Sequence, residues 1–382
     1  MLMMVMMILN AFEMGTLADR DGLERHRAVT TMAEGGGDPG RPSRISDLPG
    51  LLRLAVEAGS EEDAAPGPQG PLPMSIERRQ WLQEALSVSM SSAQDDVQLM
   101  KQALDILWAG PGGHSEAHPG PPPPPPEPDA EAPEDLPEVT TRLINALDAL
   151  LDVTDNIDNA QDFCKLGGMA LVVQRYLDAD CAELRWRAAE LVATCAQNAP
   201  RVQEAALELG ALPRLLRRAD TDADTRVRVK ALLAVSCLVR EQPLGRRALA
   251  QGDGFSVLLR AMQDPGERPR AKAAFLLHSL LMAGTENHEE LCAMGMVQQL
   301  VALLHAPHEP FHEHVLGALF SLVSGHGAAL RESRAAELRL RETLLERIGL
   351  LEGSEQHLEA LEFCRTLLQL TEAPGEEVAM DR

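Results

Sequence analysis

The sequence predicts an all-α protein, a right-handed armadillo-repeat solenoid of about four full repeats with helical capping elements at both ends. Glycines that follow apolar helical segments recur as Gly168, Gly210, Gly254 and Gly295, at intervals of 42, 44 and 41 residues. Aromatic residues make up only 3% of the 382-residue chain, which is 45% apolar, so leucine, alanine and valine must fill the core. Small aliphatic side chains suit closely packed helices better than sheets.

The charge and cysteine content limit the classes of function. The chain carries 58 acidic and 35 basic residues, a net charge of −23, whereas binding to nucleic acid or anionic membranes needs clustered lysine and arginine. The six cysteines are scattered without a CxxC motif, which favours reduced thiols and a cytoplasmic protein. Residues 1–12 are apolar and methionine-rich, but they lack a basic flank and are too short to span a bilayer. A signal-peptide core is the less favoured interpretation of this segment.

The N-terminal third is divided by its composition. Residues 1–73 are rich in glycine, proline and acidic residues and predict a disordered region, which contains a short apolar segment at residues 49–59. Residues 74–110 predict a pair of helices, the second of which carries Val97, Met100, Leu104, Leu107 and Trp108 at helical spacing. Gly110 and the following Pro-Gly-Gly end this pair.

The rest of the chain is a linker followed by the repeats. Residues 111–139 contain six consecutive prolines, which predict a stiff spacer, with a ligand for an SH3 or WW module as the alternative. Residues 140–307 predict the armadillo repeats. Residues 308–371 predict a divergent repeat from Pro310 and the C-terminal capping helices, and residues 372–382 form a tail.

The repeated positions have a physical role in a solenoid. We expect each glycine to adopt the left-handed conformation that ends one helix and starts the next. Apolar residues stand five positions after each glycine, and alanines recur at intervals of 42, where neighbouring helices must approach closely. These positions are Val173, Leu215, Leu259 and Leu300 for the apolar set, and Ala189, Ala231 and Ala273 for the alanines. Each unit would thereby bury the face that its neighbour leaves open.

One motif associated with metal catalysis occurs in the chain. Residues 308–312 match H-E-x-x-H, in which two histidines on one helix face bind zinc. Pro310 falls between His308 and His312, and proline breaks a helix interior. We therefore expect His308 in a loop and a helix that starts at Pro310. The sequence predicts no cofactor, no metal site and no catalytic residue, and it keeps a zinc hydrolase at His308 and His312 only as a minor alternative. His278, inside an apolar run, is expected to be a satisfied core or face histidine.

Basic and polar residues on the helices that follow the glycines are the candidate partner-binding residues. If those helices line the concave face, Arg214, Arg217 and Arg218 would form a cationic groove for an acidic or polar protein surface. Solvated helix charge is an equally good explanation of the same residues. The full candidate set is Gln174, Arg175, Arg214, Arg217, Arg218, Ser256, Arg260, Gln298 and Gln299.

Several segments resemble one family more specifically than a generic armadillo signature. The matching segments are residues 74–85, 158–164, 184–189, 227–232, 295–303 and 310–319, and the closing three residues Met380, Asp381 and Arg382. They are similar to the animal heat-shock-70-binding proteins, the armadillo-type nucleotide-exchange factors of cytosolic 70-kDa heat-shock chaperones. The likeness covers roughly residues 41–370 and excludes the methionine-rich start and the proline run.

The resemblance implies a co-chaperone rather than an enzyme. Members of this family grip one lobe of the chaperone's nucleotide-binding domain with their concave surface, which promotes ADP release and regulates the chaperone cycle. A flexible N-terminal segment in the family mimics a client peptide, and residues 49–59 are its counterpart here. The expected partner is thus the nucleotide-binding domain of a 70-kDa chaperone, with no nucleic acid and no membrane, and the chain is expected to be a monomer. The alternative is an armadillo scaffold that binds another protein without exchange activity.

Overall fold

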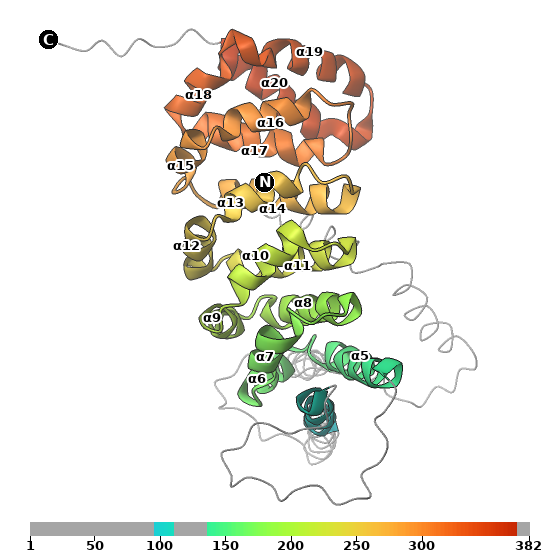
Figure 1. Ribbon diagram of the computed structural model, residues 1–382. Helices are drawn as coiled ribbons and strands as arrows, with labels where there is room; N and C mark the ends of the chain where they lie inside the picture. The colour runs from blue at the N-terminus through green and yellow to red at the C-terminus, as the bar shows by residue number, and fades with distance from the viewer. Residues whose placement is uncertain (1–94, 111–135, 373–382) are drawn as a thin grey trace, which may run out of the picture. The chain divides into compact units, whose positions relative to one another are not determined.

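The computed structural model describes residues 95–110 and 136–372, all of which belong to one compact unit, Ser91–Arg382 (Figure 1). These residues form helices and no strand, which confirms the predicted all-α class. The predicted disordered region, apolar segment at 49–59, first helix of the N-terminal pair, proline spacer and tail lie outside the described residues. Within the described ranges, no helix is both long and apolar enough to cross a membrane.

Four three-helix units form the body of the solenoid, as the period predicted. The first contains α6 (Ile157–Lys165), α7 (Gly168–Leu171) with its π-helical continuation η2 (Val172–Tyr176), and α8 (Ala182–Ala196). The second contains α9 (Pro200–Glu208), α10 (Ala211–Thr221) and α11 (Thr225–Val239). The third contains α12 (Pro243–Gln251), α13 (Gly254–Ala261) and α14 (Glu267–Ala283), and the fourth α15 (His288–Ala293), α16 (Met296–Leu304) and α17 (His312–Gly325).

The boundary after the fourth unit differs from the prediction. A divergent repeat was expected from Pro310, but α17 packs on α14 as α14 packs on α11, so it completes the fourth unit. The terminal unit contains α18 (Gly327–Ser333), η3 (Ala336–Leu338), α19 (Leu340–Leu351), η4 (Glu355–His357) and α20 (Leu358–Glu372). It closes the C-terminal end of the stack, where capping helices were predicted.

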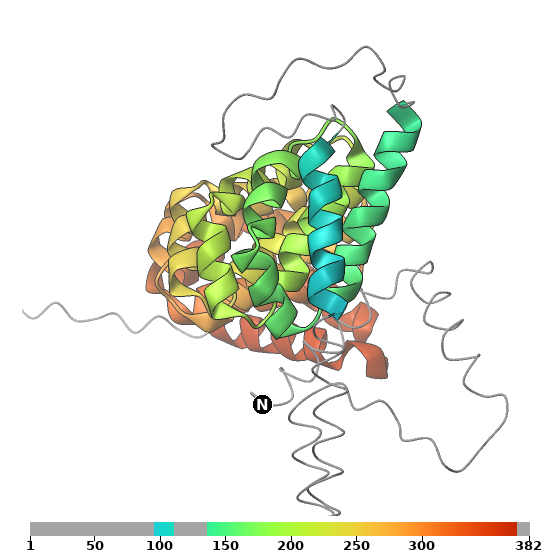
Figure 2. The same cartoon turned by 90° about the horizontal axis from the view of Figure 1, so that it is seen from below.

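The other end is capped by two helices. Residues 95–109 form the predicted second helix of the N-terminal pair, and Met100, Leu104 and Leu107 bury its apolar face. It ends at Gly110, whose φ is +58°, and lies beside α5 (Leu136–Val153) in Figure 2. The α5 helix begins at Leu136, inside the segment assigned to the linker, because Pro137 stands in its first turn, where proline is tolerated.

Two rows of helices run along the stack. The long-helix row consists of α5, α8, α11, α14, α17 and α20, each of which packs on the next (Figure 1). The middle-helix row consists of α7–η2, α10, α13 and α16. Among these described helices, α10 and α13 are the neighbouring pair with the most contact, and that contact is less extensive than any between neighbours in the long-helix row. The units are thus held closer together along the long-helix row.

The left-handed turns are displaced by one residue in two of the units. Gly210 and Gly295 have φ values of 75° and 73° as predicted, but the left-handed residues of the first and third units are Gly167 and Asp253, at 80° and 60°. Gly168 and Gly254, predicted to occupy the turn, instead begin α7 and α13. In the third unit the prediction was wrong because glycine was taken as the marker, whereas aspartate also tolerates the left-handed region. In the first unit two glycines are adjacent, and the turn is at Gly167 instead of Gly168.

Gly168 and Gly254 lack a side chain for another reason. A Cβ atom on Gly168 would lie 2.2 Å from the Phe163 ring, and one on Gly254 would lie 2.5 Å from the Leu249 side chain. Both glycines therefore allow the helix before the turn to cross the helix after it at close range.

The displaced turns also correct the predicted apolar ladder. Counted five residues from the observed turns, the ladder is Val172, Leu215, Leu258 and Leu300, none of which has exposed surface. Leu259, predicted from the wrong register, is only half-buried, while Val173 is buried as well. The predicted alanines Ala189, Ala231 and Ala273 are buried in the long-helix row, where the helices approach closely.

Candidate protein-binding surface

The nine candidate residues from the sequence all lie on the middle-helix row. Gln174 and Arg175 are in η2, Arg214, Arg217 and Arg218 in α10, Ser256 and Arg260 in α13, and Gln298 and Gln299 in α16. They were assigned to the helix that ends each unit, but each unit continues into a further long helix. Whether they bind a partner stays a prediction.

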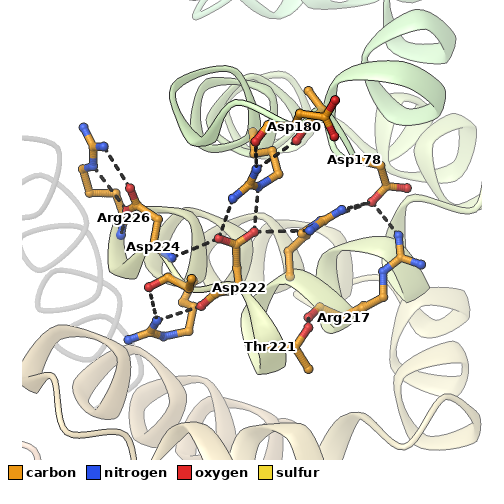
Figure 3. A network of polar contacts seen from close by, with 12 residues as sticks. Asp178, Asp180, Arg217, Thr221, Asp222, Asp224 and Arg226 are labelled. Atoms are coloured by element: carbon orange, nitrogen blue, oxygen red, sulfur yellow. Dashed lines mark hydrogen bonds and ion pairs between the residues drawn. The ribbon is translucent and has the colours of Figure 1, made fainter.

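The three arginines of α10 converge on a single carboxylate. Arg214, Arg217 and Arg218 all pair with Asp178, which follows η2 in the preceding unit, and the Arg218 Nη2 atom lies 2.7 Å from Asp178 Oδ1. Figure 3 shows the contact of Arg217 with Asp178. Burial raises the pKa of Asp178, but hydrogen bonds from Arg217 and Arg218 outweigh this and hold it below the usual value. These guanidinium groups are therefore already neutralised in part within the molecule.

The other two candidate arginines are also engaged. Arg260 forms a two-point contact with Asp220 of α10, with distances of 2.7 and 2.9 Å. Arg175 donates to the carbonyl of Trp108 at 3.0 Å, next to the hydrogen bond from the Tyr176 hydroxyl to the carbonyl of Leu107 at 2.6 Å. Arg175 thus attaches the helix of residues 95–109 to the first unit, which is a structural role.

The long-helix row presents a different surface. At its N-terminal side, the Arg187 guanidinium carbon lies 4.0 Å from the centroid of the half-buried Trp186 ring, and Arg187 pairs with Asp148 of α5 at 2.7 Å. On the next helix, Lys230 pairs with Glu190 at 2.6 Å, and Leu233 is half-buried beside it. Charged and apolar side chains therefore alternate along this part of the row.

A half-buried cluster of aromatic and histidine side chains occupies α14, α17 and α20. We call it the aromatic–histidine patch: Phe275 and His278 from α14, His314 and Phe320 from α17, and Phe363 from α20. The rings meet edge to face, at 5.3 Å between Phe275 and His314 and 5.7 Å between His278 and Phe363. Gly317 makes room for this packing, because a Cβ atom there would lie 2.5 Å from the His278 ring.

Burial shifts the pKa values of the ionisable side chains in and beside the patch. It lowers the pKa of both His278 and His314 to about 4, with the neighbouring His314 contributing to the shift of His278. The buried Nε2 atom of His278 has no hydrogen-bond partner among the described residues, so the sequence-based expectation of a satisfied histidine is not met. Nearby, burial and then the charge of Glu359 raise the pKa of Glu313 to about 7.

The sequence contained a signal for this patch that was missed. Phe275, Phe320 and Phe363 stand 45 and 43 residues apart, close to the repeat period, but aromatic residues were treated as scarce core residues. Partly exposed aromatic side chains, free of charged neighbours within the patch, are of the kind enriched at the centres of protein interfaces.

The H-E-x-x-H segment has the wrong geometry for zinc. His308 lies in the loop after α16, and α17 starts at His312, two residues later than predicted, so the two histidines do not share a helix face. Both nitrogens of His312 are used: Nδ1 accepts from the Glu309 backbone N–H at 2.9 Å, and Nε2 contacts the Leu303 carbonyl at 3.1 Å. His308 Nδ1 faces the guanidinium of Arg347 at 3.0 Å.

Known structures with the same architecture are armadillo proteins. A designed armadillo repeat protein matches with a TM-score of 0.51 at 19% identity, covering 60% of this chain and 94% of that one. Another, solved in complex with a (KR)4 peptide, matches with a TM-score of 0.52 at 20% identity, covering 61% of this chain and 94% of that one. These similarities confirm the armadillo solenoid and concern the fold alone.

Sequence relatives extend over nearly the whole chain. Hsp70-binding protein 1 of Rattus norvegicus is 48% identical over 343 residues, which cover 90% of both chains. The Homo sapiens protein of the same name is 49% identical over 342 residues, covering 90% of this chain and 89% of its own. An Hsp70 nucleotide exchange factor FES1 from Mycosarcoma maydis is 32% identical over 139 residues, covering 36% of this chain and 35% of its own.

A domain-level comparison agrees with these relatives. The family model for the SIL1/FES1/HPBP1 C-terminal domain matches residues 159–291, which run from α6 into α15. The chain therefore belongs to the Hsp70-binding protein 1 family.

Proposed function

We propose that this protein is a nucleotide-exchange factor of 70-kDa heat-shock chaperones, which binds the chaperone's nucleotide-binding domain and promotes release of ADP. The observation that carries the proposal is the near-complete match to Hsp70-binding protein 1, at 48% identity over 90% of both chains. The match to an FES1 protein named as an Hsp70 nucleotide exchange factor supports nucleotide exchange in addition to chaperone binding. We further propose a monomer that acts in the cytoplasm.

The mechanism needs no chemical step. A binding protein accelerates ADP release when it has a higher affinity for the opened arrangement of the nucleotide-binding domain than for the closed one. The binding energy then stabilises the state from which the nucleotide escapes. The side chains required are those of an interface.

The long-helix row is the surface that we assign to the chaperone. Because successive units are closer together along this row than along the middle-helix row, the stack should curve toward it and enclose a partner there. The row also carries the aromatic–histidine patch and the Trp186–Arg187 pair, the residue types that dominate interface energies. The arginines of α10 are the alternative surface, although Asp178 already pairs with all three of them.

Release of a fluorescent ADP analogue from the purified chaperone, followed by stopped flow, tests both parts of the proposal. The full chain should accelerate release, and replacing Phe320 and Phe363 by alanine should raise the half-saturating concentration at least about ten-fold, since two interface anchors are truncated. The matched control reverses Arg214, Arg217 and Arg218 to glutamate on the other row and should change it less than about three-fold.

The outcomes separate the competing explanations. Acceleration that only the arginine reversals weaken would keep the exchange activity and move the site to the middle-helix row. Tight binding without acceleration would leave an armadillo scaffold, and the absence of both would remove the 70-kDa chaperone as the partner.

A further inference from the structure

Three arginines occupy the same place in successive units of the solenoid. Arg185, Arg228 and Arg270 lie in the first turns of α8, α11 and α14, at intervals of 43 and 42 residues. Each side chain extends in two directions, back to its own unit and across to the next. We call the three contacts together the arginine ladder: Arg185 with Asp222, Arg228 with Asp264, and Arg270 with Glu309.

The first step of the ladder shows the arrangement most completely. Arg185 Nη1 donates to the carbonyls of Ala179 and Asp180, at 2.9 and 2.7 Å, in the turn that precedes its own helix. Its Nε and Nη2 atoms donate to both carboxylate oxygens of Asp222 in the next unit, at 2.7 and 2.9 Å (Figure 3). One guanidinium thus joins the equivalent turns of two units.

The same pattern repeats at the second and third steps. Arg228 donates from Nη1 to the carbonyls of Asp222 and Ala223, at 2.8 and 3.2 Å, and from Nη2 to Asp264 Oδ1 at 3.2 Å. The Nε atom of Arg228 lies 2.8 Å from Asp264 Oδ2, an ion-pair contact rather than a hydrogen bond. Arg270 donates from Nη1 to the carbonyls of Asp264 and Pro265, at 3.0 and 3.3 Å, and from Nη2 to Glu309. Three consecutive joints therefore use one design.

The carboxylates of the first two steps are fixed as well. Asp222 Oδ1 accepts from the backbone N–H of Asp224 at 3.0 Å, and Asp264 Oδ1 accepts from that of Gly266 at 2.7 Å. The side chain of Asp222 is fully buried, and those of Arg185, Asp264 and Arg228 are 11–14% exposed. These groups are shielded from solvent, which screens ordinary surface ion pairs.

A guanidinium held in this way fixes an angle as well as a distance. It is planar and donates in fixed directions, so bonds to two carbonyls and a carboxylate leave little freedom of rotation between the two turns. In a solenoid each unit contacts only its neighbours, so flexibility at each joint accumulates along the stack. The ladder thereby limits the curvature that the long-helix row can adopt.

We propose that the arginine ladder keeps the solenoid rigid, so that the long-helix row fits only the opened arrangement of the chaperone's nucleotide-binding domain. This inference rests on the proposed function. A rigid protein discriminates between the closed and the opened arrangement, whereas a flexible one adapts to both and shifts the equilibrium less. The ladder residues are positioning residues, because they act on the partner through the shape of the row.

Replacement of the ladder arginines by lysine tests the proposal in the full chain. Lysine keeps the charge but loses the planar fork, and Arg185→Lys with Arg228→Lys weakens two consecutive joints. The control is Arg247→Lys on α12, where the side chain is exposed and outside the ladder. Circular dichroism and thermal unfolding establish that each variant is folded.

The readout is the dependence of ADP release on the concentration of the added protein. The maximal acceleration by the double variant should be about five-fold lower than that by the parent protein, a size typical of the weaker couplings between two sites. The half-saturating concentration should not rise. Partial unfolding would have the opposite signature, a higher half-saturating concentration at an unchanged maximum. That signature, or a double variant that behaves like Arg247→Lys, would overturn the proposal.

A second measurement does not depend on the chaperone. Spin labels on unnatural amino acids at the exposed positions Lys165 of α6 and Glu289 of α15 report the distance across the first three units, which includes both weakened joints. The distance distribution should be narrow in the parent protein and distinctly broader in the double variant. Equal widths would refute the ladder's rigidity, whereas a parent protein that fails to accelerate ADP release would refute the proposed function instead.

Discussion

The first three joints of the solenoid and its last joint link neighbouring units by different kinds of polar contact. Between the first four units, an arginine in the first turn of a long helix binds a carboxylate of the next unit. In α17 the equivalent position, 42 residues after Arg270, is His312, whose side chain is fully buried. There the contact to the terminal unit is made from the opposite direction, by Arg347 of α19.

Arg347 makes the buried polar contacts of the last joint. It is 3% exposed and donates to the carbonyl of Leu304 from Nε and Nη2, at 3.1 and 2.6 Å, and to that of Ala306 from Nη2 at 3.0 Å. Its Nη1 atom lies 3.0 Å from His308 Nδ1, which must be unprotonated to accept a hydrogen bond. The last joint thus has a buried cation that faces carbonyls and neutral histidines instead of a carboxylate.

The difference determines the pH range in which each joint holds. Burial raises the pKa of Asp222, but its bonds to Arg185 lower it below the usual value, so that joint keeps its charge down to about pH 4. At the last joint, burial and then the charge of Arg347 lower the pKa of His308, and the same two causes lower that of His312 to about 4. The Arg185–Asp222 pair therefore resists acid, and the buried neutral histidines of the last joint do not.

The largest expected effect comes from removing the buried cation of the last joint. Arg347→Met should lower the free energy of unfolding by about 3 kcal/mol or more, because it leaves the carbonyls of Leu304 and Ala306 buried without a donor. Chemical denaturation measures the loss. Arg341→Met, which removes an exposed arginine paired with Glu372, is the control and should cost less than about 1 kcal/mol. Equal losses would mean that the last joint does not depend on Arg347.

The second largest effect is the acid sensitivity of the last joint. The pKa of His312 is about 4 in the folded protein and near 6.5 in the unfolded protein. Between these two pH values the unfolded state binds more protons than the folded state. Stability should therefore fall as the pH falls through this window, by about 2 kcal/mol from pH 7 to pH 5 for this one group. Neutral glutamine removes the titration, so the stability difference between the parent protein and His312→Gln should shrink by that amount at pH 5.

The comparison with a variant cancels an opposing contribution. The pKa of Glu313 is raised to about 7, so this carboxyl group adds stability as the pH falls from 7 toward 4.5. It does so in both proteins and leaves their difference unchanged. A difference that stays constant from pH 7 to pH 5 would contradict a neutral His312 in the last joint.

An intermediate effect is expected at the first step of the ladder. Arg185→Met should lower the free energy of unfolding by about 2 kcal/mol, since Asp222 is fully buried and keeps only its weaker contact with Arg218 and the backbone N–H of Asp224. This loss should be smaller at pH 5 than at pH 7, because without Arg185 burial raises the pKa of Asp222 and the variant can take up a proton. A loss below about 0.5 kcal/mol at pH 7 would show that this buried pair does not stabilise the first joint.

The smallest effect is expected for an exposed ion pair between the second and third units. Arg260 and Asp220 also join two units with a two-point contact, but the Arg260 side chain is 50% exposed. Arg260→Met should cost less than about 0.5 kcal/mol and lose even that in high salt. A cost equal to that of Arg185→Met would mean that burial does not decide the strength of these joints.

The fold could be predicted from the sequence because similar residues recur at a nearly constant interval, which is recognisable without a structure. Glycines and leucines near a 42-residue period gave the class, the number of units and the buried ladder. The position of the left-handed turn within each repeat could not be predicted. Asp253 adopts the left-handed conformation that was expected of a glycine, while Gly168 and Gly254 allow two helices to cross at close range. Where one unit ends and the next begins depends on packing between long helices, which the period alone does not contain.

The candidate surface was harder to predict for a related reason. Arg214, Arg217 and Arg218 look like free cations in the sequence, since their partner Asp178 precedes them by 36–40 residues. That separation is nearly one repeat, so pairing across units could have been inferred from it. The aromatic–histidine patch depends on side chains from three helices, and its members have no common local motif.

Hydroxyl-radical footprinting of the protein, alone and bound to the 70-kDa chaperone, tests the binding surface most directly. Two exposed methionines provide matched reporters: Met282, 49% exposed in α14 of the long-helix row, and Met294, 39% exposed beside the turn before α16. Binding to the long-helix row predicts that the chaperone slows oxidation of Met282 and leaves Met294 unchanged. Protection of Met294 with unchanged oxidation of Met282 would contradict it.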